Sequence, residues 1–306
     1  MQIALTDRKG CPVCGAEGFS VTHSFRRIPI YRCDECSQMY SARILAPASL
    51  EQFYAEDVDS TRHRMGQVVN ARSNAEALSR LLNLRDVHRV LDIGAGYGYL
   101  LHELRTRADI QGVGVEPSHS GARHAREKLG VDVYCCMLAD APLEPETFNA
   151  VVSFEVIEHV PDPVQFVREA AAFLRPGGHL VLLTDNFESE VVNAFGPAFP
   201  KWIPHVHINH FGPRTLRAVV EQVEDLEPIR MASYTPWELA VRAPLVRARP
   251  RPAAQQCFDL EGALAHENQG TYRLFRLRHA VNRFWFRLSW RPHGGGALMY
   301  LVCRKR

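Results

Sequence analysis

The feature that most constrains this chain is a glycine-rich turn that directly follows a short apolar segment. Arg89–Ile93 has the composition of a buried strand, and Gly94, Gly96 and Gly98 follow it at once. A helical pattern of apolar positions begins at Tyr99. Glycines between a strand and a helix let the backbone turn tightly and let a ligand approach without a Cβ in the way. The sequence therefore predicts an α/β fold with a ligand-binding turn at this point.

The spacing of the turn indicates the charge of its ligand. The pattern is Asp-x-Gly-x-Gly-x-Gly, with Asp92 two residues before the first glycine, and it differs from the G-x-G-x-x-G of dinucleotide binders. An aspartate here repels a pyrophosphate and attracts a cofactor with a cationic amino-acid end, which favours S-adenosylmethionine. The next predicted strand begins at Gln111 and ends in the acid Glu116, and an acid at this position accepts hydrogen bonds from two ribose hydroxyls.

Two further segments complete an ordered set. The segment from Phe148 to Glu155 predicts a third strand, and the segment from Leu174 to Leu183 closes a helix and opens a further strand. In this order the segments resemble the class I S-adenosylmethionine-dependent methyltransferases, over roughly residues 85 to 228. The resemblance implies a Rossmann-like, seven-stranded α/β sheet that ends with an antiparallel pair, Leu226–Ser233 and Leu298–Cys303.

The same resemblance implies which residues bind the cofactor. Many family members place an acid for the adenine amino group just after the strand at 131–135. Cys136, Met137 and Leu138 stand there in this chain, so we expect the backbone at Met137 and Leu138 to serve instead. The implied cofactor-binding residues are Asp92, Gly94, Ala95, Gly96, Gly98, Glu116, Pro117, Met137, Leu138 and Phe154.

Four cysteines near the N-terminus form two Cys-x-x-Cys pairs. Cys11 with Cys14 and Cys33 with Cys36 flank two short strand-like segments, 19–25 and 28–32. Four thiolates at this spacing suit a tetrahedral, structural Zn²⁺ ribbon, and so short a segment needs such a support to fold. The alternative is a redox dithiol or disulfides. Paired cysteines without a signal segment or a membrane-spanning apolar run predict a cytoplasmic protein.

The candidate catalytic residues lie at the end of the third predicted strand and directly after it. Glu155, Glu158 and His159 resemble the O-methyltransferases of ubiquinone biosynthesis, in which the corresponding residues are associated with a divalent metal near the substrate oxygen. The resemblance thus implies Mg²⁺, and the alternative is that Glu158 and His159 cap and orient the next helix. His207 is a second candidate base, since a histidine ahead of the last core helix recurs near substrate in related enzymes. Together with His205 and His210 it could also bind a metal or form one substrate-facing wall.

The pattern along the chain predicts four parts. They are a zinc ribbon (1–45), a helical lid or linker (46–84), the cofactor-binding core (85–233) and a basic insertion with the final strand (234–306). In the second part we expect a capped helix after Pro47, a polar loop over 57–64 and an amphipathic helix over 70–84. In the last part, 244–252 is rich in proline and arginine and predicts a loop.

The insertion also predicts a basic amphipathic helix over 273–291. Residues 229–306 carry 14 Arg and Lys against four Asp and Glu. We expect the apolar face of the helix to pack on the core and the basic face to lie near a phosphate-bearing acceptor; peripheral contact with a membrane or an anionic partner is the alternative. The predicted apolar face holds Leu274, Leu277, Val281, Phe284 and Leu288, and the basic face holds Arg276, Arg283 and Arg287.

These features predict a methyltransferase for a small-molecule or sugar-containing acceptor, acting on oxygen in a natural-product or surface-glycan pathway. One alternative is a zinc-ribbon RNA methyltransferase. Against nucleic acid as the partner, Phe154-Glu155 stands in place of the N/D-P-P-Y motif used for base amines. A second alternative is a non-catalytic, cofactor-binding docking module, which the intact Asp92, glycines and Glu116 disfavour. The sequence assigns no oligomeric state.

Overall fold

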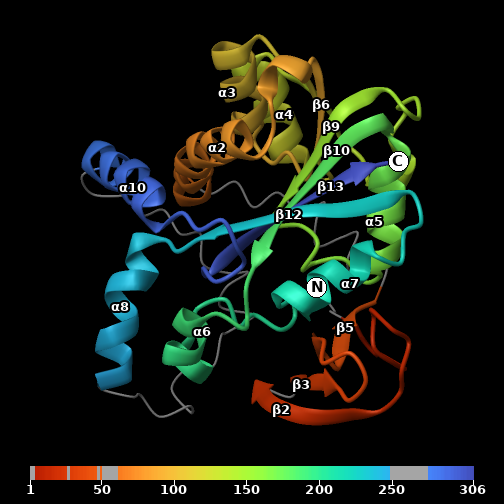
Figure 1. Cartoon of the computed structure of the whole chain (residues 1–306), viewed down its shortest axis with the longest axis vertical. Helices are drawn as coiled ribbons and strands as arrows, with labels where there is room; N and C mark the ends of the chain where they lie inside the picture. The colour runs from red at the N-terminus through yellow and green to blue at the C-terminus, as the bar shows by residue number, and fades with distance from the viewer. Residues whose placement is uncertain (1–3, 26–27, 47–48, 50–60, 249–274) are drawn as a thin grey trace.

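The core of the computed structural model is a seven-stranded sheet with helices on both faces (Figure 1). The structure describes residues 4–25, 28–46, 49, 61–248 and 275–306. The strand order is β12-β13-β10-β9-β6-β7-β8, and β13 runs antiparallel to both of its neighbours. The strands are β6 (Arg89–Ile93), β7 (Gln111–Val115), β8 (Asp132–Tyr134), β9 (Phe148–Phe154), β10 (Leu174–Asp185), β12 (Leu226–Tyr234) and β13 (Leu298–Lys305).

This sheet confirms the predicted fold, including the antiparallel pair formed by β12 and β13. The central strands read as continuous apolar runs because both of their faces are covered. In β9, for example, six of seven residues are buried. The parallel neighbours β6, β7 and β9 bring their carboxyl ends to one edge of the sheet, where ligands bind in open α/β sheets.

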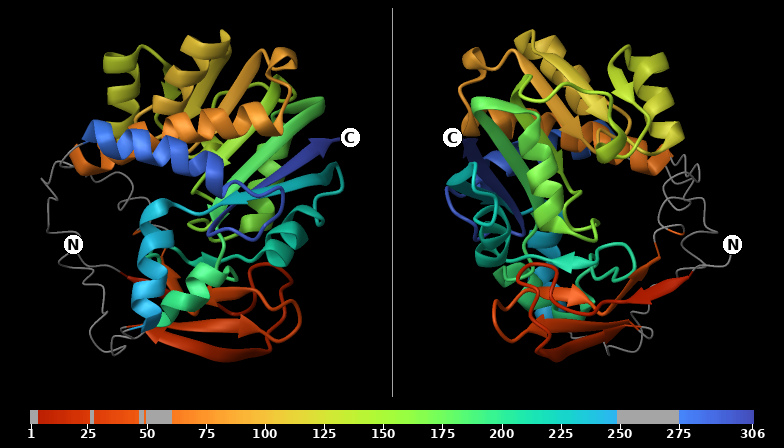
Figure 2. Two further views of the ribbon diagram at one scale, coloured as in Figure 1. Left: turned by 60° about the vertical axis from the view of Figure 1, so that its left-hand side comes forward. Right: turned by 90° about the vertical axis from the view of Figure 1, so that its right-hand side faces the viewer.

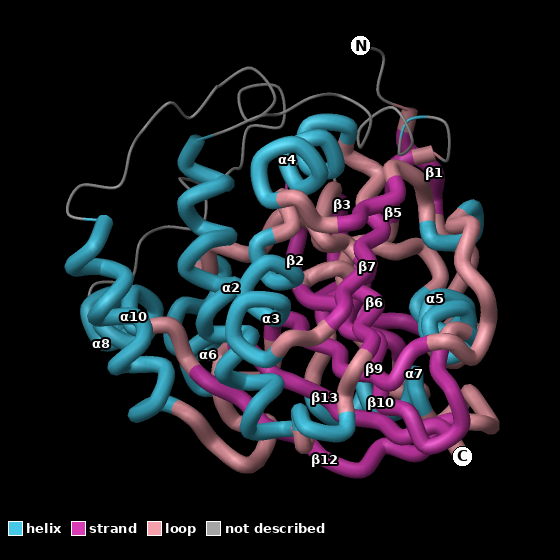
Figure 3. The backbone as a smooth tube through the Cα atoms, turned by 90° about the horizontal axis from the view of Figure 1, so that it is seen from above, coloured by secondary structure: helices cyan, strands magenta, loops and turns pink. Residues whose placement is uncertain are grey.

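Two helical layers enclose the sheet (Figure 3). One apolar cluster joins it to α5 (Pro163–Ala172) and α7 (Pro213–Val220) through side chains such as Val167 and Leu216. The other joins it to α2 (Thr61–Leu81) and α3 (Tyr99–Ala108) through Leu78 and Leu104. The remaining helices are α4 (His119–Leu129), α6 (Glu190–Phe195), α8 (Trp237–Ala248), α10 (Phe275–Ser289) and the 3-10 turns η1 (Leu84–Asp86), η2 (Leu138–Asp140) and η3 (Gly196–Ala198). Among the residues described, no helix combines the length and the apolar character that a bilayer crossing demands.

The N-terminal segment that carries the four cysteines forms most of a second sheet, of order β11-β4-β3-β2. Three of its strands come from the N-terminal segment, and the fourth, β11 (Asn209–His210), comes from the core part of the chain. The strands are β2 (Phe19–Phe25), β3 (Ile28–Cys33) and β4 (Met39–Ser41), while β1 (Leu5–Asp7) pairs separately with β5 (Arg43–Leu45). We call the described residues between 4 and 45 the four-cysteine unit.

An aromatic cluster fixes the four-cysteine unit against the core. Ile30 and Met39 pack there with Phe187, Phe199 and Trp202, which follow β10. Figure 2 shows the red N-terminal strands next to α6 and α8 in both views. The four-cysteine unit therefore shares a hydrophobic core with residues more than a hundred positions away in the sequence.

Some local predictions are wrong. Residues 61–64, predicted as part of a loop, are the first turn of α2, which also starts earlier than the helix expected at 70. Pro244–Ala248, expected in a loop, completes α8, which accommodates Pro244 inside the helix. The helix expected after Pro47 lies outside the described residues.

The expected helix near the C-terminus is present as α10, but it packs through a different face. Leu277, Val281, Phe284 and Leu288 are exposed, so the predicted apolar face does not pack on the core. Phe286 is buried instead and packs on Tyr234, at 4.9 Å between ring centroids. Of the predicted basic face, Arg287 pairs with Glu76 of α2 at 2.7 Å, and Arg283 is exposed. Leu274 and the side chain of Arg276 lie outside the described residues.

Replacing Phe286 with alanine should lower the free energy of unfolding by about 3–5 kcal/mol, because it opens a cavity beside Tyr234. Phe284→Ala is the matched control: this side chain is 65% exposed, and its loss should change stability by less than about 0.5 kcal/mol. Denaturant titration of both variants measures the two values. Equal losses would mean that α10 packs through its predicted face after all.

Candidate active site

The glycine turn lies between β6 and α3, and its backbone is one that only glycine adopts readily. Gly94, Gly96 and Gly98 have φ angles of +78°, +53° and +80°. Space is equally limiting, since a Cβ at Gly98 would lie 2.7 Å from the Cβ of Ala125. The turn thus brings bare backbone to the carboxyl end of β6, as the sequence predicts.

Two buried carboxylates adjoin this turn. Glu116 follows β7 and accepts hydrogen bonds from the backbone N–H groups of Gly96, at 2.7 Å, and Ser118, at 2.8 Å. Burial raises the pKa of Asp92 to about 7, and the neighbouring Glu116 carboxylate adds to the shift. Burial also raises the pKa of Glu116, against the two amide hydrogen bonds that lower it. A cationic ligand bound next to these two acids would therefore stabilise their charged forms, which burial disfavours.

The other predicted cofactor-binding residues lie along the same edge of the sheet. Pro117 follows β7, Met137 and Leu138 follow β8, and Phe154 ends β9. Met137 is 40% exposed and Leu138 is buried, so Met137 presents an accessible apolar side chain next to the buried side chain of Leu138. Their contacts with a cofactor stay a prediction.

Gln67 is a part of this site that the sequence did not reveal. Its side-chain Oε1, on α2, accepts a hydrogen bond from the backbone N–H of Tyr97 at 3.0 Å. The guanidinium of Arg64, one turn earlier, lies 6.0 Å from the centroid of the Tyr97 ring. The first turns of α2 therefore cover the glycine turn, although polar residues on a helix give no sequence signal for such a role.

Glu116→Ala should weaken S-adenosylmethionine binding by about 1.5–3 kcal/mol, because charge-assisted hydrogen bonds to the ribose hydroxyls are lost. Isothermal titration calorimetry measures the affinity. Glu127→Ala, on the exposed side of α4, is the control and should bind as the unaltered protein does. Undiminished affinity in Glu116→Ala would contradict the assignment of this carboxylate to the cofactor.

A second group of acids gathers at the ends of β9 and β10. Glu155 follows β9 with a φ of +57°, a strained conformation for a residue with a side chain, of the kind that clusters at functional sites. Glu158 is fully buried and accepts a hydrogen bond from the Thr184 hydroxyl at 2.9 Å. Asp185, which ends β10 and which the sequence did not single out, is also buried. Single carboxylate oxygens of Glu155, Glu158 and Asp185 lie within 4.8 Å of one another.

Lys201 supplies the positive charge of this group. Its Nζ donates to Glu155 Oε1 at 2.8 Å and lies 3.6 Å from Asp185 Oδ2. The pKa of Lys201 is raised by Asp185 and Glu155, although burial opposes the shift. Burial raises the pKa of Glu158 to about 8 and that of Asp185 to about 6. We call these four residues, Glu155, Glu158, Asp185 and Lys201, the acid–lysine cluster.

Two of the predicted histidines meet beside the acid–lysine cluster. The rings of His159 and His207 lie edge to face, 4.7 Å apart. His159 Nδ1 lies 3.0 Å from the carbonyl oxygen of Val206, and His207 Nδ1 lies 3.6 Å from Asp185 Oδ2. Burial lowers the pKa of His159 to about 4, and burial is also the largest cause that lowers the pKa of His207 well below its usual value. Both imidazoles are therefore neutral at pH 7, because burial disfavours their protonated forms.

The three histidines near β11 do not face a common point. His210 packs against the rings of Trp202, at 4.8 Å, and Phe187, at 4.6 Å. Among the described residues, His207 is grouped with Glu158 and His159, and neither His205 nor His210 belongs to a group of possible metal ligands. This arrangement gives no support to a metal held by His205, His207 and His210.

A divalent ion such as Mg²⁺ does not fit the acid–lysine cluster as it stands. The oxygen donors match the ion chemically, since Mg²⁺ prefers carboxylate oxygens. The ammonium of Lys201, however, already contacts Glu155 and lies close to Asp185. A second cation would have to displace it or lie beside it.

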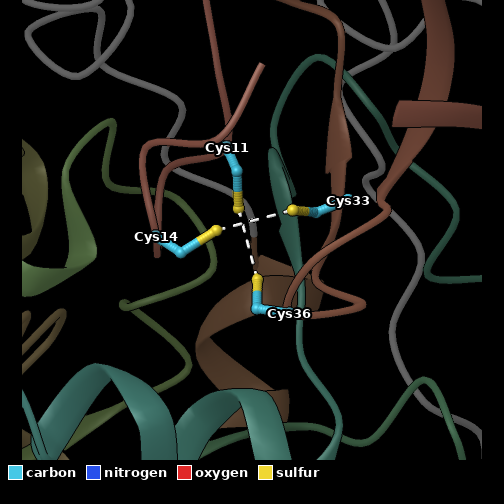
Figure 4. Close-up of side chains that lie close together, drawn as sticks. All are labelled: Cys11, Cys14, Cys33 and Cys36. Atoms are coloured by element: carbon cyan, nitrogen blue, oxygen red, sulfur yellow. Dashed lines mark hydrogen bonds between the residues drawn. The ribbon is translucent and has the colours of Figure 1, made fainter. Parts of the chain in front are cut away.

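The cysteines of the four-cysteine unit converge on one point (Figure 4). Cys11 Sγ and Cys36 Sγ are 3.5 Å apart, as are Cys14 Sγ and Cys33 Sγ. These separations are far longer than a disulfide bond of about 2.05 Å. They are close to the spacing of about 3.8 Å between sulfurs that each lie about 2.3 Å from a tetrahedral Zn²⁺. The four residues therefore fit a zinc ion, and the paired-disulfide alternative is not seen.

Comparisons with known proteins agree with this geometry. A family model described as a methyltransferase domain matches residues 62–224. A ubiquinone biosynthesis O-methyltransferase from Bradyrhizobium sp. (strain ORS 278) is 38% identical over 140 residues, covering 43% of this chain and 53% of the relative. One from Xanthomonas campestris pv. campestris (strain B100) is 33% identical over 168 residues, covering 50% of this chain and 70% of the relative.

The chain thus spans about half the length of the first of these relatives. Among solved structures, an S-adenosylmethionine-dependent methyltransferase from Thermotoga maritima superimposes with a TM-score of 0.52 at 20% identity, covering 80% of this chain and 94% of that one. At this identity the match concerns the fold. The family model, the relatives, the seven-stranded sheet and the acid-flanked glycine turn agree: the chain belongs to the class I S-adenosylmethionine-dependent methyltransferases.

Proposed function

We propose that this protein transfers the methyl group of S-adenosylmethionine to a hydroxyl oxygen of a small-molecule or sugar-containing acceptor. The observation that carries the proposal is the neutral, buried His207 next to Asp185, at the same sheet edge as the glycine turn. The names of the relatives, which are O-methyltransferases, support oxygen as the methyl acceptor.

The proposed reaction uses His207 as a general base. Its Nε2 takes the hydroxyl proton while the acceptor oxygen forms a bond to the sulfonium methyl carbon. The carbon–sulfur bond breaks, and its electron pair stays on sulfur to give S-adenosylhomocysteine. The Asp185 carboxylate, 3.6 Å from His207 Nδ1, stabilises the imidazolium that forms. His159 packs edge-on against the His207 ring and so limits its orientation.

The four-cysteine unit has a structural role in this proposal. A Zn²⁺ held by its four cysteines would fix the two Cys-x-x-Cys turns, and β4 would in turn support β11 next to His207. The proposal includes an acceptor from a natural-product or surface-glycan pathway, which is the class that the sequence features predict.

A screen with labelled methyl donor tests the function. Phenols, catechols, nucleotide sugars, amines and total RNA serve as acceptors, and mass spectrometry with nuclear magnetic resonance locates the methyl group on the product. We expect a methyl ether in the hydroxyl classes. Methylation confined to amines, carbon or RNA would overturn the proposal, as would cofactor binding without transfer to any class.

A further inference from the structure

The acid–lysine cluster contains three acids and one ammonium group in a small, mostly buried space. Glu158 and Asp185 are 0% and 1% exposed. Neither Glu158 Oε1 nor Asp185 Oδ2 has a hydrogen-bond partner, although both atoms are buried. Clustered buried carboxylates are stable only when a cation or hydrogen bonds compensate them. Among the residues that the structure describes, Lys201 supplies the compensating positive charge.

Lys201 reaches the cluster from a separate segment of the chain. It lies between η3 and β11, whereas Glu155 follows β9 and Asp185 ends β10. Its Nζ lies 2.8 Å from Glu155 and 3.6 Å from Asp185, so one ammonium links the ends of two core strands. Asp185 in turn lies 3.6 Å from Nδ1 of His207. The chain of contacts therefore runs from Lys201 through Asp185 to His207.

We propose that Lys201 is the built-in cation of this site and stands where a divalent metal ion would otherwise bind. As a positioning residue, it holds Asp185 next to His207 and Glu155 at the end of β9, so that the three acids of the cluster need no divalent ion for methyl transfer. The inference rests on the proposed function only for the identity of the base. The cation itself is tested without any acceptor.

Mn²⁺ is the probe, because its electron paramagnetic resonance signal reports binding directly. The unaltered protein should not bind added Mn²⁺ at the acid–lysine cluster. Lys201→Gln removes the ammonium and keeps the three acidic side chains, so it should bind one Mn²⁺ at least about tenfold more tightly than the unaltered protein. Adding Asp185→Asn to Lys201→Gln should abolish that binding. Lys128→Gln, on the exposed side of α4, removes a charge elsewhere and is the matched control.

Activity gives a second readout once an acceptor is identified. Lys201→Gln should lower kcat about 100-fold with little change in the affinity for S-adenosylmethionine, and added Mn²⁺ or Mg²⁺ should restore part of the loss. Lys201→Arg keeps the positive charge and should retain more activity than Lys201→Gln, without metal dependence. Thermal melts and cofactor binding of each variant show that it is folded.

Two results would overturn the proposal. One is binding of Mn²⁺ by the unaltered protein that Asp185→Asn abolishes, because the site would then hold a metal alongside Lys201. The other is a folded Lys201→Gln that binds Mn²⁺ no better than the unaltered protein. Neither result bears on whether the acceptor atom is oxygen, so the failure of this inference is distinguishable from failure of the proposed function.

Discussion

His207→Asn should lower kcat by about 10²–10⁴-fold, the usual contribution of a positioned general base. Asparagine can still meet Asp185 but cannot accept the acceptor's proton. The Kd for S-adenosylmethionine should change less than about twofold, because the glycine turn and Glu116 are untouched. Single-turnover kinetics with saturating cofactor measure the effect on the chemical step.

Two further variants, His159→Asn and His88→Asn, test whether the loss of activity is specific to His207. His159 contacts His207 and the Val206 carbonyl, so its loss should give a smaller decrease through misorientation of the base. His88 is exposed at the amino end of β6 and serves as the control. Activity of His207→Asn within about tenfold of the unaltered protein would rule out His207 as the base.

Cys14→Ser should have the largest effect on stability. A structural zinc site contributes roughly 10–16 kcal/mol in isolated zinc peptides, which is comparable to the whole stability of about 5–15 kcal/mol of a typical domain. We expect the variant to lose its zinc and the four-cysteine unit to unfold. Because β4 pairs with β11, hydrogen exchange should also quicken at Asn209 and His210.

Elemental analysis and hydrogen exchange by mass spectrometry measure these outcomes together. Cys135→Ser is the matched control, since Cys135 lies outside the group of four cysteines and contacts His119 instead. Zinc-free protein from a preparation without chelators, still folded throughout the four-cysteine unit, would contradict the zinc assignment.

The parts of the site that could be predicted from the sequence are those whose chemistry is local. Asp92, the three glycines and Glu116 are within 25 positions of one another, and each stands at the end of an unambiguous apolar strand. Glu155, Glu158 and His159 likewise follow β9 directly. The positions of such residues can be predicted from the sequence because the strand directly before them fixes where they lie.

The parts that could not be predicted depend on long-range packing. Lys201 and Asp185 are isolated residues in the sequence, and only the path of the chain after β10 brings the lysine back to Glu155. The two residues of β11 are too few to show a strand pattern. On α10 the apolar spacing correctly indicates a helix, but it does not indicate which face of the helix packs on the core. Phe286, outside the predicted stripe, packs on Tyr234 and decides the orientation.

Strand β11 also limits how far the four-cysteine unit can change without affecting the segment that carries His207. Ser41 donates its backbone N–H to the carbonyl of Ile208 at 2.9 Å and its hydroxyl to the carbonyl of Pro204 at 2.6 Å. The N–H of Ile208 in turn donates to the Glu158 carbonyl at 2.8 Å. A shortened chain beginning at residue 46 would expose one side of the segment that carries His207. The four-cysteine unit is therefore not an interchangeable module, because replacing it would also change the support of the proposed base.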